Sequence, residues 1–244
     1  MKQYSEIYLK AKVKLALNHY KRNKEQVLLI APGWTMSKDS KFIKQAAIEF
    51  AKTFDVISFD FRGHGRSSGF YTFSKKEPDD LNAVVDYAKG IYKKVYVIGF
   101  SMGGAISIIQ SAAQSNADCL IIVSAPHSFE KIKNVKWIKD FLTNPFKKYE
   151  FKKWIRVRVS PIIQKMVKPI DVVDKINCPT LFIAGDNDTI ILPDDTKSLF
   201  EKAKCKKEFE LFEGCNHAED LIYQQKEKFI KTCTNWLCSC LRTA

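Results

Sequence analysis

Five short apolar runs without polar alternation constrain the fold of this chain most strongly. Each has the length of a β-strand, and an unbroken apolar run is typical of a strand buried on both faces of a parallel sheet. The runs cover residues 27–31, 56–59, 95–99, 119–123 and 180–184. Stretches of helical character separate or follow them, at residues 42–54, 79–90, 103–115, 194–204 and 221–241. This alternation predicts an α/β fold with a mostly parallel twisted sheet and helices on both faces.

Weaker patterns mark the two ends of the sheet. Residues 7–17 alternate apolar and basic side chains, which is the period of a half-buried strand, so the chain is expected to open with an antiparallel edge. Residues 208–212 have the composition of a last strand.

The segment 126–176 interrupts the alternation of strands and helices. Two amphipathic basic stretches stand where one crossover helix is expected, and three prolines punctuate them. In the first stretch, residues 129–142, the apolar side chains share one helical face, which we expect to lie over Ser101. We therefore predict a small helical cap at residues 126–176, inserted after the sixth strand, with residues 1–125 and 177–244 forming the core domain.

The chain has a formal net charge of +13, and the cap holds much of the excess, with twelve basic and three acidic residues between Pro126 and Lys168. Such a segment favours peripheral contact with an anionic membrane or an acidic substrate, and a solvated basic face is the alternative. Lysine makes up most of the 40 basic residues and is scattered along the chain. Because nucleic-acid-binding proteins use clustered arginine and aromatic side chains, no nucleic-acid partner is expected.

The cysteines and the N-terminal sequence bear on the compartment. The 7 cysteines form an odd set without a Cys-x-x-Cys pair, so we expect neither a disulfide framework nor a zinc site. The N-terminus carries frequent charges, and no stretch approaches the roughly 18 apolar residues of a membrane span. These observations predict a soluble protein of a reducing, cytoplasmic compartment.

A Gly-x-Ser-x-Gly sequence, Gly99-Phe-Ser101-Met-Gly103, stands between a buried apolar run and a helical stretch. This is the context of a nucleophile elbow, in which a strained turn lifts a serine hydroxyl out of the sheet and small flanking residues are required. Ser101 is the predicted nucleophile. The amide of Met102, at the start of the following helix, is the predicted oxyanion donor.

A serine nucleophile needs a histidine to take its proton and a carboxylate to orient that histidine. Asp188 and Asp186 lie on the loop after the run at 180–184, and Asp188 is the predicted acid, with Asp186 as the alternative. His217 follows the last predicted strand and comes after both residues in the chain, so it is the predicted base.

These segments occur in the order typical of the α/β-hydrolase family, which the chain resembles over nearly its whole length. Asp60-Phe-Arg-Gly-His-Gly-Arg-Ser resembles the family's D-x-R-G-x-G-x-S segment, and the loop after Gly185 resembles its acid-bearing loop, which strengthens Asp188. His64 lies within the first segment, and we expect it to brace this glycine-rich loop.

The chain departs from that family at Ala31-Pro-Gly-Trp34, where relatives usually carry His-Gly. Because the second oxyanion donor is a backbone amide, Pro32 removes only its own N–H. The amide of Trp34 is the predicted donor, and that of Thr35 is the alternative.

The sequence therefore predicts a serine hydrolase that cleaves carboxylic esters through an acyl-enzyme on Ser101. The resemblance includes esterases, lysophospholipases and monoacylglycerol lipases, and it implies no cofactor and no metal. The expected partner is a small-molecule ester with a small or medium acyl or aromatic group. Amide or peptide cleavage by the same residues, and a non-catalytic binding protein that uses the basic cap, are the alternatives.

Overall fold

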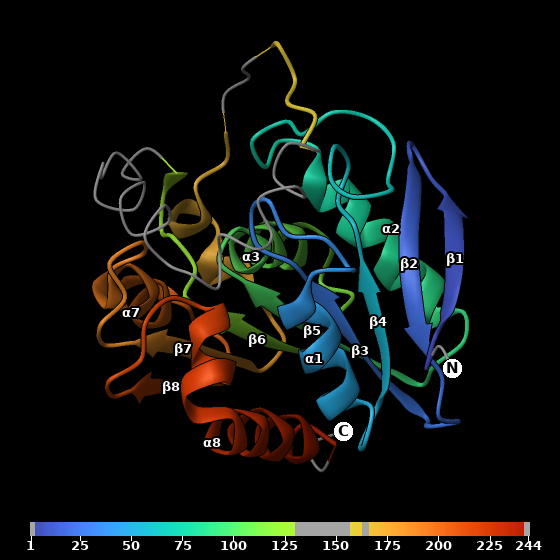
Figure 1. Cartoon of the computed structure of the whole chain (residues 1–244). Helices are drawn as coiled ribbons and strands as arrows, with labels where there is room; N and C mark the ends of the chain where they lie inside the picture. The colour runs from blue at the N-terminus through green and yellow to red at the C-terminus, as the bar shows by residue number, and fades with distance from the viewer. Residues whose placement is uncertain (1–2, 130–156, 163–165, 242–244) are drawn as a thin grey trace.

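One sheet of eight strands forms the centre of the computed structural model, which describes residues 3–129, 157–162 and 166–241. The strands are β1 (Ser5–Lys10), β2 (Lys14–Tyr20), β3 (Gln26–Ala31), β4 (Asp55–Phe59), β5 (Lys94–Phe100), β6 (Cys119–Val123), β7 (Thr180–Gly185) and β8 (Lys207–Phe212). Their order in the sheet is β1-β2-β4-β3-β5-β6-β7-β8. The pairs β1–β2 and β2–β4 are antiparallel and all others are parallel, so the predicted mostly parallel sheet is confirmed (Figure 1).

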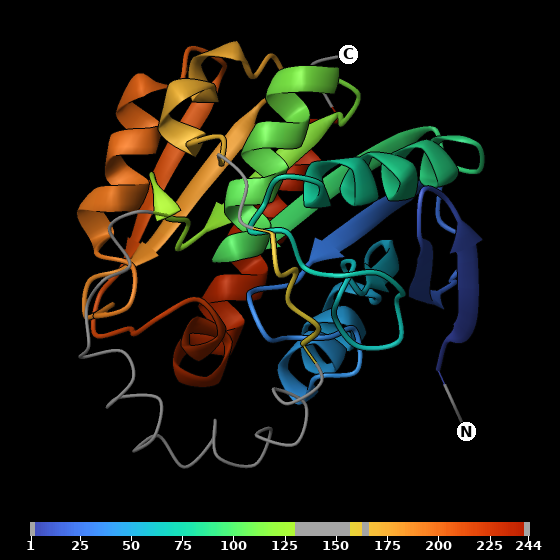
Figure 2. The ribbon, with the colours of Figure 1, turned by 90° about the horizontal axis from the view of Figure 1, so that it is seen from above.

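Helices cover both faces of the sheet, as Figure 2 shows. The helices α1 (Lys41–Phe50) and α8 (Glu219–Ser239) lie on one face, and α2 (Glu77–Lys89), α3 (Met102–Gln114) and α7 (Pro193–Lys202) lie on the other. Alternate residues of β3 feed the two cores, with Leu28 and Ile30 packed beneath α1 and Val27 and Leu29 on the opposite face. This two-sided burial is the physical reason why the strands are continuous apolar runs.

The predicted antiparallel edge at the N-terminus is confirmed. β1 pairs with β2 and β2 pairs with β4, both antiparallel, and β1 and β2 form a hairpin in which Lys10 lies opposite Lys14. The alternation of side chains continues through the three-residue turn, so the sequence period does not mark the point where the chain reverses.

Only parts of the predicted cap lie among the described residues. They include two short 3₁₀ turns, η2 (Pro169–Asp171) and η3 (Val173–Lys175), and the segment 157–162. This segment lies against the loop after β4, because Tyr71 donates its N–H to the Arg158 carbonyl at 2.7 Å and Ser160 donates to the Tyr71 carbonyl at 2.8 Å. Most of the amphipathic stretch 129–142 lies outside the described residues, and the division into core and cap stays a prediction.

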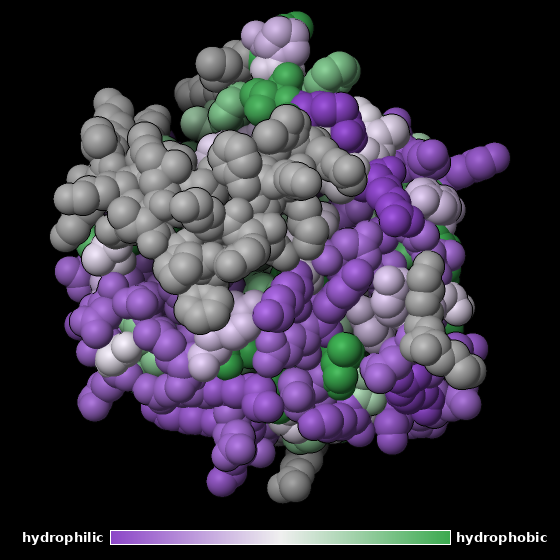
Figure 3. Space-filling model, viewed as in Figure 1, coloured by the Kyte–Doolittle hydropathy of each residue, from purple (hydrophilic) through white to green (hydrophobic). Residues whose placement is uncertain are grey.

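The hydropathy of the surface changes towards the tip of the molecule. Figure 3 shows a mainly hydrophilic face with hydrophobic atoms gathered at the top, where Figure 1 places the segment 157–162 in yellow. Val159 and Ile162 in this segment are 45% and 66% exposed.

The C-terminal helix α8 has 21 residues and a kink at Gln225, whose backbone is not helical. No helix in the described ranges has both the length and the apolar composition needed to cross a membrane. A disulfide joins Cys119, the first residue of β6, to Cys240 just after α8. The sequence predicted no disulfide framework, and it carried no signal for this single bond because the two cysteines are 121 residues apart and only tertiary packing brings them together.

A buried ion pair connects the loop after β4 to α2. The Arg62 guanidinium donates to Asp80 at 2.6–3.0 Å, and the Arg62 backbone N–H donates to the same carboxylate at 2.9 Å. Both side chains are almost fully buried. The pair therefore holds this loop against the helix.

Substituting Asp80→Asn should lower the free energy of unfolding by about 3–5 kcal/mol, because the Arg62 charge would remain buried without its counter-ion. The control Glu25→Gln breaks an exposed ion pair between Glu25 and Lys93, whose side chains are 64% and 76% exposed respectively. It should change the free energy of unfolding by less than about 1 kcal/mol. Urea unfolding of both variants measures the difference. Equal losses would mean that burial does not set the strength of the Arg62–Asp80 pair.

Candidate active site

Ser101 occupies a strained turn between β5 and α3. Its backbone has φ 51° and ψ −115°, in the region of positive φ that non-glycine residues rarely adopt. The turn is held from both sides, because the Ser101 N–H donates to the Val123 carbonyl at 2.8 Å and the Ser101 carbonyl accepts the Ala105 N–H at 3.1 Å. This is the backbone geometry of the nucleophile elbow that the sequence predicts.

The glycines around Ser101 are required by close backbone contacts. A Cβ atom on Gly99 would lie 2.6 Å from the Gly103 carbonyl oxygen. A Cβ atom on Gly103 would lie 2.2 Å from the carbonyl oxygen of Ala31, at the end of β3. Both contacts are with backbone atoms, so a side chain at either position would push two main-chain segments apart.

Met102 is the first residue of α3, directly after Ser101. The first amides of a helix have no partner within the helix and lie at the positive end of its dipole. The Met102 N–H therefore stands at a position suited to stabilise negative charge beside the Ser101 side chain.

Asp188 and His217 form a hydrogen-bonded pair. Asp188 lies on the loop after β7 and His217 on the loop after β8, and His217 Nδ1 is 2.7 Å from Asp188 Oδ2. The other carboxylate oxygen of Asp188 accepts the backbone N–H groups of Ile190 and Ile191, each at 2.9 Å. Both side chains are buried. A carboxylate held in this way accepts a hydrogen bond from Nδ1–H, which selects one tautomer of the imidazole.

Of the two carboxylates that the sequence left open, Asp188 is the one bonded to His217. Asp186 is exposed, and its backbone N–H bonds to the Phe212 carbonyl of β8. Ser101, Asp188 and His217 follow the carboxyl ends of β5, β7 and β8, which run parallel, so they lie at one edge of the sheet.

Backbone contacts connect the loops that carry Asp188 and His217. Asn187 donates its N–H to the Cys215 carbonyl at 2.9 Å, and a Cβ atom on Gly185 would lie 2.4 Å from that same oxygen. The Ser124 hydroxyl, at the end of β6, accepts the Ala218 N–H at 3.2 Å. No sequence pattern marks Ser124, which follows the strand whose last residue, Val123, also bonds Ser101.

The loop after β3 contacts the elbow. A Cβ atom on Gly33 would lie 3.6 Å from Ser101 Cβ and 3.5 Å from the Phe100 carbonyl oxygen. The Met36 N–H donates to the Gly33 carbonyl at 3.2 Å, and Thr35 has a φ of 67°. This tight turn places Gly33 next to the serine, and Trp34 and Thr35 follow it directly in the chain, whereas Pro32 has no N–H to offer.

Comparison with known proteins agrees with this architecture. A family model described as alpha/beta hydrolase fold matches residues 26–144. The chain has the α/β-hydrolase fold. The resemblance inferred from the sequence is thereby confirmed.

Two curated proteins are similar to this chain in sequence. It is 27% identical over 177 residues to the uncharacterized protein YqkD of Bacillus subtilis, a match that covers 67% of this chain and 56% of that protein. The chain thus spans little more than half the length of that relative. It is 23% identical over 217 residues to a monoglyceride lipase homolog of Monkeypox virus, covering 75% of this chain and 78% of the viral protein.

Solved structures share the α/β-hydrolase fold over almost the whole chain. An esterase of Pyrococcus furiosus superimposes with a TM-score of 0.79 at 24% identity, covering 97% of this chain and 92% of that one. An esterase of a Rhodococcus species superimposes with a TM-score of 0.80 at 18% identity, covering 98% and 100%. At these identities the likeness establishes the fold.

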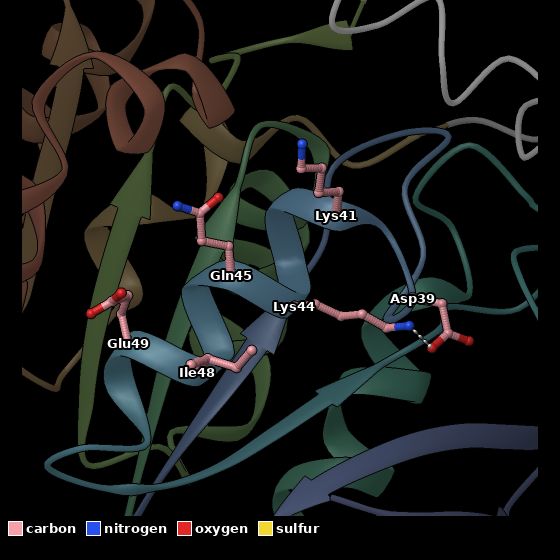
Figure 4. Close-up of a pocket in the computed structure, with 6 residues that line it drawn as sticks. All are labelled: Asp39, Lys41, Lys44, Gln45, Ile48 and Glu49. Atoms are coloured by element: carbon pink, nitrogen blue, oxygen red, sulfur yellow. Dashed lines mark ion pairs between the residues drawn. The ribbon is translucent and has the colours of Figure 1, made fainter. Parts of the chain in front are cut away.

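A separate pocket lies along the outer face of α1 in this hydrolase fold, and Figure 4 shows the side chains around it. Its lining consists of Asp39, Lys41, Lys44, Gln45, Ile48 and Glu49. No residue predicted for the active site lines this pocket. The described residues contain no group of three or more His, Cys, Asp or Glu side chains that could hold a metal ion.

His64 is buried inside the glycine-rich loop after β4. Its Nδ1 lies 3.0 Å from the Arg62 carbonyl oxygen, and its ring stands edge-on to Tyr71 with 5.2 Å between the ring centres. Burial lowers the pKa of His64 to about 4; the hydrogen bond to Arg62 opposes this effect and the charge of Arg158 adds to it. His64 is therefore neutral at pH 7, and these contacts agree with a bracing role.

Stability should depend on His64 between pH 7 and pH 5. The unfolded chain has a histidine pKa near 6.5, so it takes up a proton in this range that the folded protein does not. Lowering the pH from 7 to 5 should therefore reduce the free energy of unfolding in both the wild type and a His64→Gln variant. The loss should be about 2 kcal/mol larger in the wild type. Urea unfolding at both pH values measures the two losses, and equal losses would contradict the buried, neutral state of His64.

Proposed function

We propose that this protein is a serine esterase that cleaves carboxylic esters through an acyl-enzyme on Ser101. The observation that carries the proposal is the strained backbone of Ser101 at the junction of β5 and α3, where φ 51° is combined with ψ −115°, outside the left-handed helical region that Ser115 occupies with φ 50° and ψ 33°. The bonded pair His217–Asp188 at the same edge of the sheet supports it. The esterase and lipase names among the similar proteins agree with this reaction class.

In the proposed reaction, Ser101 Oγ attacks the acyl carbonyl carbon while His217 accepts the hydroxyl proton. Since Nδ1 of His217 faces Asp188, Nε2 is the nitrogen that takes this proton. The Asp188 carboxylate stabilises the imidazolium that forms. His217 then gives the proton to the leaving alcohol, and a water molecule releases the acid from Ser101 in the reverse sequence of steps.

The negative charge that develops on the carbonyl oxygen needs hydrogen-bond donors that are already in position. We assign this role to the backbone amides of Met102 and Trp34. Thr35 offers the alternative amide on the same turn. The protein supplies all of these groups itself, and the proposed chemistry uses no metal or cofactor.

Exposed apolar side chains at the carboxyl edge of the sheet support an ester with an apolar acyl or aromatic group. Trp34, Phe70 and Leu192 are 40%, 56% and 52% exposed. They lie on the loops that follow β3, β4 and β7, at the carboxyl edge of the sheet where Ser101 also lies. Apolar surface at the mouth of a site favours apolar substrates, because burying it removes that surface from water.

The decisive experiment is hydrolysis of p-nitrophenyl esters from acetate to palmitate by the purified protein and by Ser101→Ala. We expect turnover of short or medium esters and covalent labelling of the wild type by a fluorophosphonate, both absent from Ser101→Ala. Aminoacyl amides tested in parallel distinguish an amidase with the same residues. Absence of turnover and labelling in the wild type would overturn the proposal in favour of a binding protein.

The roles of Asp188 and Asp186 can be separated by matched substitutions. Asp188→Asn should lower kcat for ester hydrolysis by about 10³–10⁴-fold, because the amide favours the wrong imidazole tautomer. Asp186→Asn, on the same loop but exposed, should leave kcat within about threefold. Steady-state kinetics of both variants test this assignment, and a larger effect at Asp186 would reverse it.

A further inference from the structure

The carboxylate of Asp60 lies buried between two loops and has no role in the proposed reaction. Asp60 follows β4 directly and is 0% exposed. One of its oxygens, Oδ1, accepts the backbone N–H of Lys38 at 2.6 Å, and the other, Oδ2, accepts the backbone N–H of Arg66 at 2.8 Å. A single side chain thus bonds the loop after β3 and the loop after β4.

The position of Asp60 is closely defined by its surroundings. A Cβ atom on Gly65 would lie 2.2 Å from Asp60 Oδ2, so only glycine at this position lets the loop approach the carboxylate. The Ser67 hydroxyl donates to the Asp60 carbonyl at 2.6 Å and accepts the Ala16 N–H at 2.9 Å. Asp60 is therefore an immobile acceptor for the loops that bond to it.

Residues 32–38, which we call the oxyanion loop, run from the elbow to Asp60. At one end Gly33 contacts Ser101, and at the other end Lys38 bonds Asp60. The next turn is held by the Ser40 hydroxyl, which accepts the Ser37 N–H at 3.1 Å. Trp34, whose amide is the proposed oxyanion donor, lies between these two fixed points.

The Lys38 side chain holds the far end of the oxyanion loop in place. It is 1% exposed and donates to Glu6 Oε1 and Asp39 Oδ2, both at 2.9 Å. Asp39 in turn pairs with Lys44 of α1 at 3.1 Å, the contact drawn in Figure 4. A buried lysine with two carboxylate partners cannot easily be displaced, because moving it would leave charge unpaired.

We propose that Asp60 is a positioning residue that holds the Trp34 amide at the distance from Ser101 which the oxyanion requires. This inference rests on the proposed esterase function. A hydrogen bond to a carboxylate is stronger than one to a neutral acceptor, and an oxyanion donor stabilises the transition state only when it is already in place. Burial raises the pKa of Asp60 to about 6, and the N–H groups of Arg66 and Lys38 oppose this rise, so the carboxylate is ionised at pH 8.

The test is an Asp60→Asn variant at pH 8. The asparagine has nearly the same shape, but it offers one oxygen and an NH₂ group to two N–H donors, so one of the two bonds is lost. We expect kcat per fluorophosphonate-labelled site to fall about 10–100-fold with KM within about threefold, because the loss acts on the transition state. Amide hydrogen exchange of residues 31–40 should also accelerate relative to residues 100–110.

Glu77→Gln is the matched control. Glu77 is another fully buried carboxylate that accepts a backbone N–H, that of Thr72 at 2.8 Å, but it holds a loop that carries no proposed donor. This variant should lose stability while kcat stays within about threefold and exchange in residues 31–40 is unchanged. A fall in kcat equal to that of Asp60→Asn would overturn the positioning role in favour of a general effect of destabilisation.

A milder variant keeps the test decisive if Asp60→Asn does not fold. Ser40→Ala removes only the bond to the Ser37 N–H and should lower kcat about two- to tenfold with KM unchanged. Unchanged kcat and unchanged exchange in residues 31–40 would overturn the inference. Absence of ester turnover in the wild type would overturn the proposed function alone, because the exchange measurement still reports whether Asp60 holds the loop.

Discussion

The close backbone approach at Gly103 is the contact on which the rest of the site depends. Because residue 103 has no side chain, α3 begins directly against the end of β3, with Gly103 Cα beside the Ala31 carbonyl. This contact brings the loop after β3 to Ser101. Since β5 lies between β3 and β6, the loops after both neighbouring strands converge on the turn that follows it. The position of Ser101 therefore follows from backbone packing rather than from side-chain contacts.

Buried carboxylates hold the surrounding loops in place. Asp188 accepts two backbone N–H groups beside His217, Asp60 accepts one from each of two loops, and Asp80 accepts that of Arg62 together with its guanidinium. Loops lack the regular hydrogen bonds of helices and strands, so their amides need other partners when they are buried. Carboxylates provide strong ones, and the loops keep a defined shape without secondary structure. Such rigidity is what a preorganised oxyanion site requires.

Much of this site could be predicted from the sequence because each part has a local signature. The elbow around Ser101 is marked by glycines that stand between a strand and a helix, and the loop after β7 carries two acidic residues at the position expected for the acid. The choice between Asp186 and Asp188 could not be derived from composition, because both are aspartates on one loop. The bond between Asp188 and His217 separates them geometrically.

Local sequence patterns predicted the order of strands and helices, the parallel sheet and the elbow. Strands buried on both faces require apolar runs, and tight turns require glycine. The reversal at residues 11–13, the disulfide between Cys119 and Cys240 and the bond from Lys38 to Asp60 became visible only in three dimensions. The hydrogen bond from Lys38 to Asp60 and the disulfide each join residues that are far apart in the chain through single atoms. The chain reversal at residues 11–13 does not interrupt the alternation of apolar and basic residues. The period of a sequence predicts which face of an element is buried. It does not predict which atom, distant in the chain, accepts a hydrogen bond from that element.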